Sequence, residues 1–150
     1  MYARALSDFY LHTAPLLPQR CGGKGSNQAI NARRAGSKVA FIGAVGDDAS
    51  GGSALDMWRR EAIDTSFTVI RPGTSTGMAF ILIEASGENQ IVVSPGANSS
   101  LSPKDLTAAR SCIAGASMVL AQLEVPTATV AEAFRLGREA GAVTVLNAAP

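Results

Sequence analysis

Residues 22–46 read GGKGSNQAINARRAGSKVAFIGAVG, and this stretch decides the fold. A cluster of glycines leads directly into a helix predicted over residues 26–35, which Gly36 ends. A short apolar strand is predicted over residues 39–42, ended by Gly43. The order of glycine loop, helix and strand is typical of an α/β protein whose loop approaches a ligand.

The glycine loop itself carries the strongest local signal for function. Its glycines let the backbone approach a ligand, and the helix that follows offers free N–H groups and a positive dipole end. Lys24 adds a mobile cation, and Asn27 brings a donor and an acceptor suited to sugar hydroxyls. A flexible turn before a helix is the alternative interpretation. The Walker and dinucleotide patterns are excluded, because Pro18 and Gln28 stand where those patterns need glycine.

The rest of the chain alternates helical and strand-like segments. Further helices are predicted over residues 53–62, from Ser102–Pro103 onward with Ser102 as N-cap, and from Thr127 as cap to about residue 140. Residues 118–120 are predicted as a buried strand and 143–146 as the last strand, which implies a parallel sheet with right-handed crossovers. Three β-rich runs, at residues 67–70, 77–83 and 90–93, predict a small flap that could serve as a lid over a ligand.

Composition sets the broad class of the protein. The 150 residues are 47% hydrophobic and 17% charged, as in one globular domain, and the net charge of +1 argues against nucleic-acid and membrane partners. No segment is apolar enough to predict a signal peptide or a membrane span, so the expected compartment is the cytoplasm. Cys21 and Cys112 have no metal-ligand spacing, and two reduced thiols are favoured over one disulfide.

Five motifs in one register resemble the ribokinase family of sugar kinases, also called the pfkB carbohydrate kinases. They are residues 22–46, residues 45–48 with Gly51, residues 87–98, residues 122–124, and residues 146–150. The third of these resembles the ribokinases themselves more than the adenosine or fructose kinases of the family. The resemblance implies an α/β fold: a partial ribokinase-like, Rossmann-type parallel sheet with helices on both faces and a small β-flap, the lid, inserted over about residues 67–93. It covers residues 22–150, whereas residues 1–21 form an irregular segment that does not match the family.

The same resemblance implies a set of sugar-binding residues. They are Gly23, Lys24, Gly25, Ser26, Asn27 and Glu124, with Ala79 and Ile81 as lid residues over the bound sugar. Glu124 could instead be an acid that leads a helix ahead of Pro126, and Ala79 and Ile81 could be core or hinge residues. We interpret Asp47 and Asp48 as turn residues that cap a helix beginning near Ser50 or Gly51, not as a metal or acid pair.

The activity implied by the resemblance is ATP-dependent phosphorylation of a pentose, ribose to ribose 5-phosphate. ATP and Mg²⁺, with K⁺ as a candidate activator, are the implied cofactors. In the family their sites and the catalytic aspartate belong to the second half of the chain, so no catalytic residue and no metal site are expected in this one. The implied partner is a small-molecule sugar. A second copy of the chain could also pair through the lid, because edge strands readily dimerise. The alternatives are a non-catalytic sugar-binding or dimerising module and a non-functional truncated product. An exposed edge at the last strand also predicts a marginally stable or aggregation-prone protein.

Overall fold

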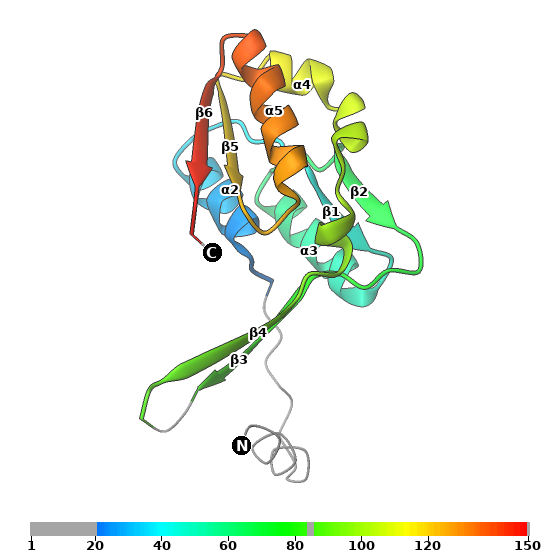
Figure 1. Ribbon diagram of the computed structural model, residues 1–150, viewed down its shortest axis with the longest axis vertical. Coiled ribbons are helices and arrows are strands. Elements are labelled where there is room, and N and C mark those ends of the chain that lie inside the picture. The colour runs from blue at the N-terminus through cyan, green and yellow to red at the C-terminus, as the bar shows by residue number, and fades with distance from the viewer. Residues whose placement is uncertain (1–20, 84–85, 150) are drawn as a thin grey trace.

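The computed structural model describes residues 21–83 and 86–149. The segment predicted to be irregular, residues 1–21, therefore lies outside the described residues except for Cys21. Figure 1 shows a body of strands and helices, from which a single β-hairpin projects.

Helix α2 (Lys24–Arg34) confirms the helix predicted after the glycine loop, although it begins at Lys24 and not at Ser26. Gly23 is its N-cap, with a φ of 92°, and a side chain would strain the backbone at that angle. Gly36, with a φ of 96°, follows the C-terminal end of the helix, as predicted. The helix therefore starts and stops at glycines that the sequence already displays.

Strands β1 (Gly43–Gly46) and β2 (Thr68–Arg71) pair in parallel, and α3 (Ala49–Arg60) connects them. The strand predicted over residues 39–42 is wrong in position, because only an isolated bridge between Ala40 and Asp64 forms there. Two residues lie between Ala40 and Gly43, but three lie between Asp64 and Thr68. This extra residue breaks the ladder, so the regular strand starts only at Gly43.

The second parallel pair consists of β5 (Met118–Gln122) and β6 (Val143–Asn147), connected by α5 (Thr127–Glu139). Both the helix and the last strand confirm the prediction, but Thr127 is the first helical residue and Pro126 is the N-cap. No side chain caps this helix. The helix is fastened instead by Thr129, whose buried hydroxyl donates to the carbonyl of Leu101 at 2.8 Å.

The helix predicted from Ser102–Pro103 is a 3₁₀ helix, η2 (Pro103–Thr107), preceded by η1 (Gly96–Ser100) and followed by the short helix α4 (Arg110–Ala114). Ser102 is the N-cap, as predicted, and forms a reciprocal capping box with Asp105. Asp105 is also paired with Arg71 of β2 at 2.6 Å. The capping signal was therefore correct, while the type and length of the helix were not.

The hairpin of β3 (Met78–Ile83) and β4 (Asn89–Ser94) is antiparallel, and we refer to it as the lid. The prediction of a lid that begins near residue 67 is wrong, because β2 pairs in parallel with β1 in the body. The connections between the strands explain the difference. β2 follows α3 as the second strand of a β–α–β unit, whereas β3 and β4 are consecutive strands of a hairpin.

Helical segments pack on both faces of β1 and on one face of β5, which confirms the α/β fold class. Consecutive residues of β1 point to opposite faces. Val45 joins a cluster with residues of α2 and α3, while Ala44 joins Ala97 and Leu101. Val119 of β5 packs with residues of η2, α4 and α5. The described strands form three separate two-stranded ladders, β1–β2, β3–β4 and β5–β6.

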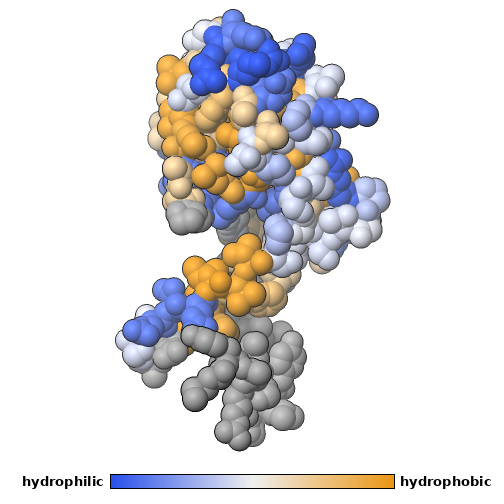
Figure 2. Space-filling model, in the orientation of Figure 1, coloured by the Kyte–Doolittle hydropathy of each residue, from blue (hydrophilic) through white to orange (hydrophobic). Residues whose placement is uncertain are grey.

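One face of the β5–β6 ladder is exposed and apolar. Met118 lies opposite Val143, and Leu120 lies opposite Val145, so these four side chains share a face. They are between 37% and 57% exposed. Figure 2 shows hydrophobic residues gathered along this side of the body. The prediction of a buried strand over residues 118–120 is therefore wrong for this face, because α5 covers only the opposite one, at Val119.

We expect this face to drive self-association of the purified chain, because contiguous exposed apolar area of this kind promotes association. Replacing Leu120 and Val145 together with lysine should lower the aggregated fraction several-fold in light scattering after size-exclusion chromatography. Ser53→Lys, on the exposed side of α3, is the control for added charge. If the control lowers aggregation as much as the double variant does, net charge and not this face would be responsible.

Candidate functional site

The glycine loop places the first turn of α2 beside the carboxyl end of β5. A Cβ added at Gly25 would lie 3.1 Å from Nε2 of Gln122, the last residue of β5, so the loop passes close over the strand. Gly23 is restricted in another way, by its positive φ, because a Cβ there would meet only Glu124 Oε2 at 3.5 Å. This is the edge of a parallel sheet where α/β proteins commonly bind ligands.

Glu124 and Lys24 meet at this edge although 100 residues separate them. The backbone N–H of Lys24 donates to Glu124 Oε2 at 2.9 Å, and Lys24 Nζ lies 3.3 Å from Glu124 Oε1. The carboxylate therefore lies at the positive end of the α2 dipole as well as beside a cation. Both side chains are about one-third exposed, which leaves the pair accessible from solvent.

Gln122, the last residue of β5, contacts the backbone of Glu124. Its Oε1 accepts a hydrogen bond from the backbone N–H of Glu124, which fixes the turn that follows β5. Sequence analysis quoted Gln122 as part of a motif but gave it no role. The signal that could have identified it is the polar side chain at the end of an otherwise apolar strand.

Ser26 faces the interior and not the solvent. Its side chain is buried, and its Oγ accepts a hydrogen bond from Trp58 Nε1 of α3 at 2.8 Å. Trp58 in turn stacks on Phe41, with ring centroids 4.1 Å apart. The structure therefore places Ser26 as the residue that fastens the glycine loop to α3, a contact that sequence analysis did not foresee.

Asn27 lies exposed on the first turn of α2, next to the loop. Its backbone N–H donates to the carbonyl of Gly23 at 2.9 Å, and its own carbonyl accepts from the Asn31 side chain at 2.8 Å. Of the predicted sugar-binding residues, the structure thus gathers the glycine loop and Glu124 in one place.

The predicted lid residues lie apart from that place. Ala79 and Ile81 share one face of β3, as the alternation predicts, and both are exposed. Figure 1 shows the lid projecting away from the body, and Figure 2 shows its surface as largely hydrophobic next to the body. In this arrangement the lid does not cover the glycine loop.

Asp48 is confirmed as a helix cap. Its Oδ1 accepts the backbone N–H of Gly51 at 2.8 Å, and α3 begins at the next residue, Ala49. Asp47 accepts the backbone N–H of Gly73 at 3.0 Å, in the turn after β2. Hydrogen bonds from Thr76, first from its hydroxyl, hold the pKa of Asp48 below its ordinary value.

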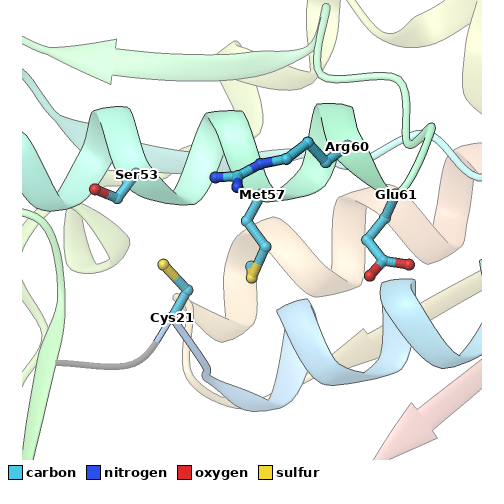
Figure 3. A pocket seen from close by; sticks show the side chains of 5 residues that line it. All are labelled: Cys21, Ser53, Met57, Arg60 and Glu61. Atoms are coloured by element: carbon cyan, nitrogen blue, oxygen red, sulfur yellow. The ribbon is translucent and has the colours of Figure 1, made fainter. Parts of the chain in front are cut away.

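A shallow pocket of about 400 Å³ lies between α3 and the residue that precedes the glycine loop. Figure 3 shows its lining: Cys21, Ser53, Met57, Arg60 and Glu61. Neither Lys24 nor Glu124 lines it. Within residues 21–83 and 86–149, no group of three or more His, Cys, Asp or Glu side chains could hold a metal ion. In the same residues no helix is long and apolar enough to cross a membrane.

Comparison with known proteins decides the family. A model described as "pfkB family carbohydrate kinase" matches residues 1–150. The chain belongs to the pfkB family. That match includes residues 1–21, which sequence analysis had set apart from the family.

Among pfkB relatives, the ribokinase of Haemophilus influenzae is 42% identical over 129 residues, which cover 86% of this chain and 42% of that one. The deoxyribokinase of Salmonella typhi is 36% identical over 137 residues, covering 91% of this chain and 45% of that one. The structure of Arabidopsis thaliana ribokinase complexed with ribose and ATP aligns with a TM-score of 0.79 at 25% identity, over 85% of this chain and 42% of that one. The chain thus spans less than half the length of these relatives.

Proposed function

We propose that this chain forms the sugar-binding half of an ATP-dependent kinase that phosphorylates ribose or a related pentose. The observation that carries the proposal is the meeting of Lys24 and Glu124 at the N-terminal end of α2, beside the carboxyl end of β5. The names of the pfkB relatives, ribokinase and deoxyribokinase, support a pentose as the acceptor class.

The chemistry of the cluster suits a polyhydroxylated ligand. The Glu124 carboxylate can accept hydrogen bonds from two adjacent hydroxyls, and such charge-assisted bonds are the stronger kind. Asn27 can donate and accept, and the glycines allow a sugar ring to approach the backbone. We assign Gly23, Lys24, Gly25, Asn27 and Glu124 to direct contact with the sugar. We assign Ser26 to holding the loop in place, since its hydroxyl is bonded to Trp58.

The nucleotide belongs elsewhere in this proposal. The family resemblance puts the sites for ATP, Mg²⁺ and K⁺ in the second half of such kinases, and the pocket beside α3 includes neither Lys24 nor Glu124. We therefore assign no step of phosphate transfer to the residues of this chain. The chain by itself is expected to bind sugar without transferring phosphate, and the half that binds ATP would have to be supplied by further sequence.

A second copy of the chain is the partner proposed for the lid. Six large apolar side chains on its two strands are at least 45% exposed. They are Phe80, Ile81, Ile83, Ile91, Val92 and Val93. A two-stranded hairpin exposed on both faces is only marginally stable alone, so pairing with a second lid would stabilise it. This observation also favours a dimerising module as the second candidate function.

Calorimetric titration of ribose into the purified chain tests the proposed function. We expect saturable binding, and Lys24→Met should weaken it about tenfold, because one charge-assisted hydrogen bond contributes about 1.5 kcal/mol or more. The backbone N–H of Lys24 that contacts Glu124 remains in this variant. Lys38→Met, an exposed lysine beyond α2, is the matched control and should bind as the wild-type chain does. A folded chain that gives no saturable heat with ribose or 2-deoxyribose would contradict the proposal.

A further inference from the structure

Among the described residues, the hydrogen bonds that join the lid to the body lie at its base. Its two strands expose apolar residues on both faces, so they gain little from packing against other elements. The position of the hairpin therefore depends on two short stems, residues 74–77 before β3 and residues 95–98 after β4. These stems converge on the end of β1 and the start of α3, where the contacts become unusually close.

Asp48 and Thr76 together join three elements at this base. Its Oδ1 accepts the backbone N–H of Gly51 at 2.8 Å and the hydroxyl of Thr76 at 2.6 Å, while its Oδ2 accepts the backbone N–H of Thr76 at 2.8 Å. The Thr76 hydroxyl accepts in turn from the backbone N–H of Gly46 at 2.9 Å. One carboxylate thus ties the first stem of the lid to α3, and Thr76 ties the same stem to β1.

Glycines allow the backbones to approach at this point. A Cβ on Gly46 would overlap the carbonyl of Thr74 and lie 2.7 Å from the nitrogen of Thr76. A Cβ on Gly77 would lie 2.7 Å from the carbonyl oxygen of Pro95, in the second stem. The two stems are also joined directly, because the backbone N–H of Ala97 donates to the carbonyl of Ser75 at 2.9 Å. The base is therefore a tightly fitted junction and not a loose loop.

Helix α3 connects this junction to the glycine loop. Asp48 caps its first turn, and Trp58, about 15 Å further along a helix of this geometry, donates to Ser26 in the loop. The same rigid element thus contacts the lid stem at one end and the candidate sugar-binding loop at the other. A change at Asp48 can therefore alter how the lid lies relative to the glycine loop without a change to Lys24 or Glu124.

We propose that Asp48 is the positioning residue of the lid, acting through Thr76 to hold the hairpin at a fixed angle to α3. Its hydrogen bonds to Thr76 are charge-assisted, which makes them stronger than a bond between neutral groups. Any effect of Asp48 on closure of the lid over a bound sugar rests on the proposed function, whereas its effect on the mobility of the lid does not.

The test measures lid mobility directly. A fluorophore is attached at Ser86→Cys, in the turn between β3 and β4, after Cys21→Ser and Cys112→Ala remove the native thiols. Asp48→Ala and Thr76→Val should both lower the fluorescence anisotropy. In Asp48→Ala the backbone N–H of Thr76 loses its acceptor, so exchange of this amide hydrogen should accelerate about tenfold. Thr76→Ser keeps the hydroxyl and should restore wild-type values. Asp47→Asn is the matched control. Asp47 is the neighbouring carboxylate, and it accepts a hydrogen bond from the backbone N–H of Gly73 in the turn after β2.

The outcomes separate a positioning role from a merely structural one. Thr76→Val leaves the Asp48 cap on Gly51 intact, so it decides the question if Asp48→Ala fails to fold. Unchanged anisotropy in Thr76→Val, in a chain whose Trp58 fluorescence shows that it is folded, would overturn the proposal. The measurements are made without ribose and then repeated with it. A chain that never binds ribose but loosens its lid as described refutes the proposed function and supports the inference about Asp48.

Discussion

Replacing Glu124 with alanine in a chimera that joins this chain to the second half of a ribokinase is expected to lower kcat/KM for ribose about 100-fold. The change removes hydrogen bonds from a charged acceptor to the sugar, each contributing about 1.5 to 3 kcal/mol, and a tenfold change in rate corresponds to about 1.4 kcal/mol. It also removes the acceptor for the backbone N–H of Lys24, which is left at the N-terminal end of α2 without that partner. The variant therefore loses both the hydrogen bonds to the sugar and the contact that holds the start of α2 beside β5.

A chimera supplies the activity that the chain is not expected to show alone. Residues 22–149 would replace the matching segment of the Haemophilus influenzae ribokinase, which is 42% identical over 129 residues. Phosphorylation of ribose by ATP is followed with a coupled assay for ADP. Glu132→Gln is the control, because Glu132 is a carboxylate paired with Arg135 on α5, away from the glycine loop. A Glu124→Ala chimera as active as its parent would show that the carboxylate does not contact the sugar.

Replacing Gly46 with alanine is expected to unfold the chain or to destabilise it by about 4 kcal/mol or more, within the range of the most damaging substitutions. The added Cβ would overlap the backbone carbonyl of Thr74, and backbone atoms cannot move aside as the end of a flexible side chain can. The free energy of unfolding of a small domain is about 5 to 15 kcal/mol, so this change would remove a large part of it. Urea unfolding followed by Trp58, the single tryptophan, measures the effect.

Gly52→Ala provides the matched control for that experiment. Gly52 is exposed within α3, and no atom lies within 4 Å of the Cβ position. Alanine is favoured over glycine inside helices by about 1 kcal/mol, so this variant should be more stable than the wild-type chain. Equal urea midpoints for Gly46→Ala and Gly52→Ala would show that the junction at the base of the lid can relax.

Several local features were predictable because a few neighbouring residues determine them. The glycines around α2, the capping box of Ser102 with Asp105, and the cap at Asp48 each depend on backbone angles or on hydrogen bonds across three residues. The site could be predicted only in part. The resemblance to a family named Lys24 and Glu124 together, while the residues alone favoured Glu124 as an acid that leads a helix ahead of Pro126.

Two of the errors, in the positions of strands, share one cause, which is that pairing partners lie far away in the sequence. Residues 39–42 have the composition of a strand, but the spacing of the partner segment near Asp64 moves the regular ladder to Gly43–Gly46. Residues 67–70 were predicted as the first strand of the lid, yet the strand that forms there, β2, pairs in parallel with β1. The residues within one strand do not specify which distant segment pairs with it or in which register.

By itself the sequence determined the α/β class, the positions of the glycine-bounded helix and the last strand, and the family. These follow from periodicity, turn chemistry and motifs that act within a few residues. Only the tertiary structure decided that Ser26 bonds to Trp58, that Gln122 supports Glu124, and that Asp48 fastens the base of the lid through Thr76. Such contacts join residues that are distant in sequence, so they exist only after the helices have packed on the strands and brought the polar groups within hydrogen-bonding distance.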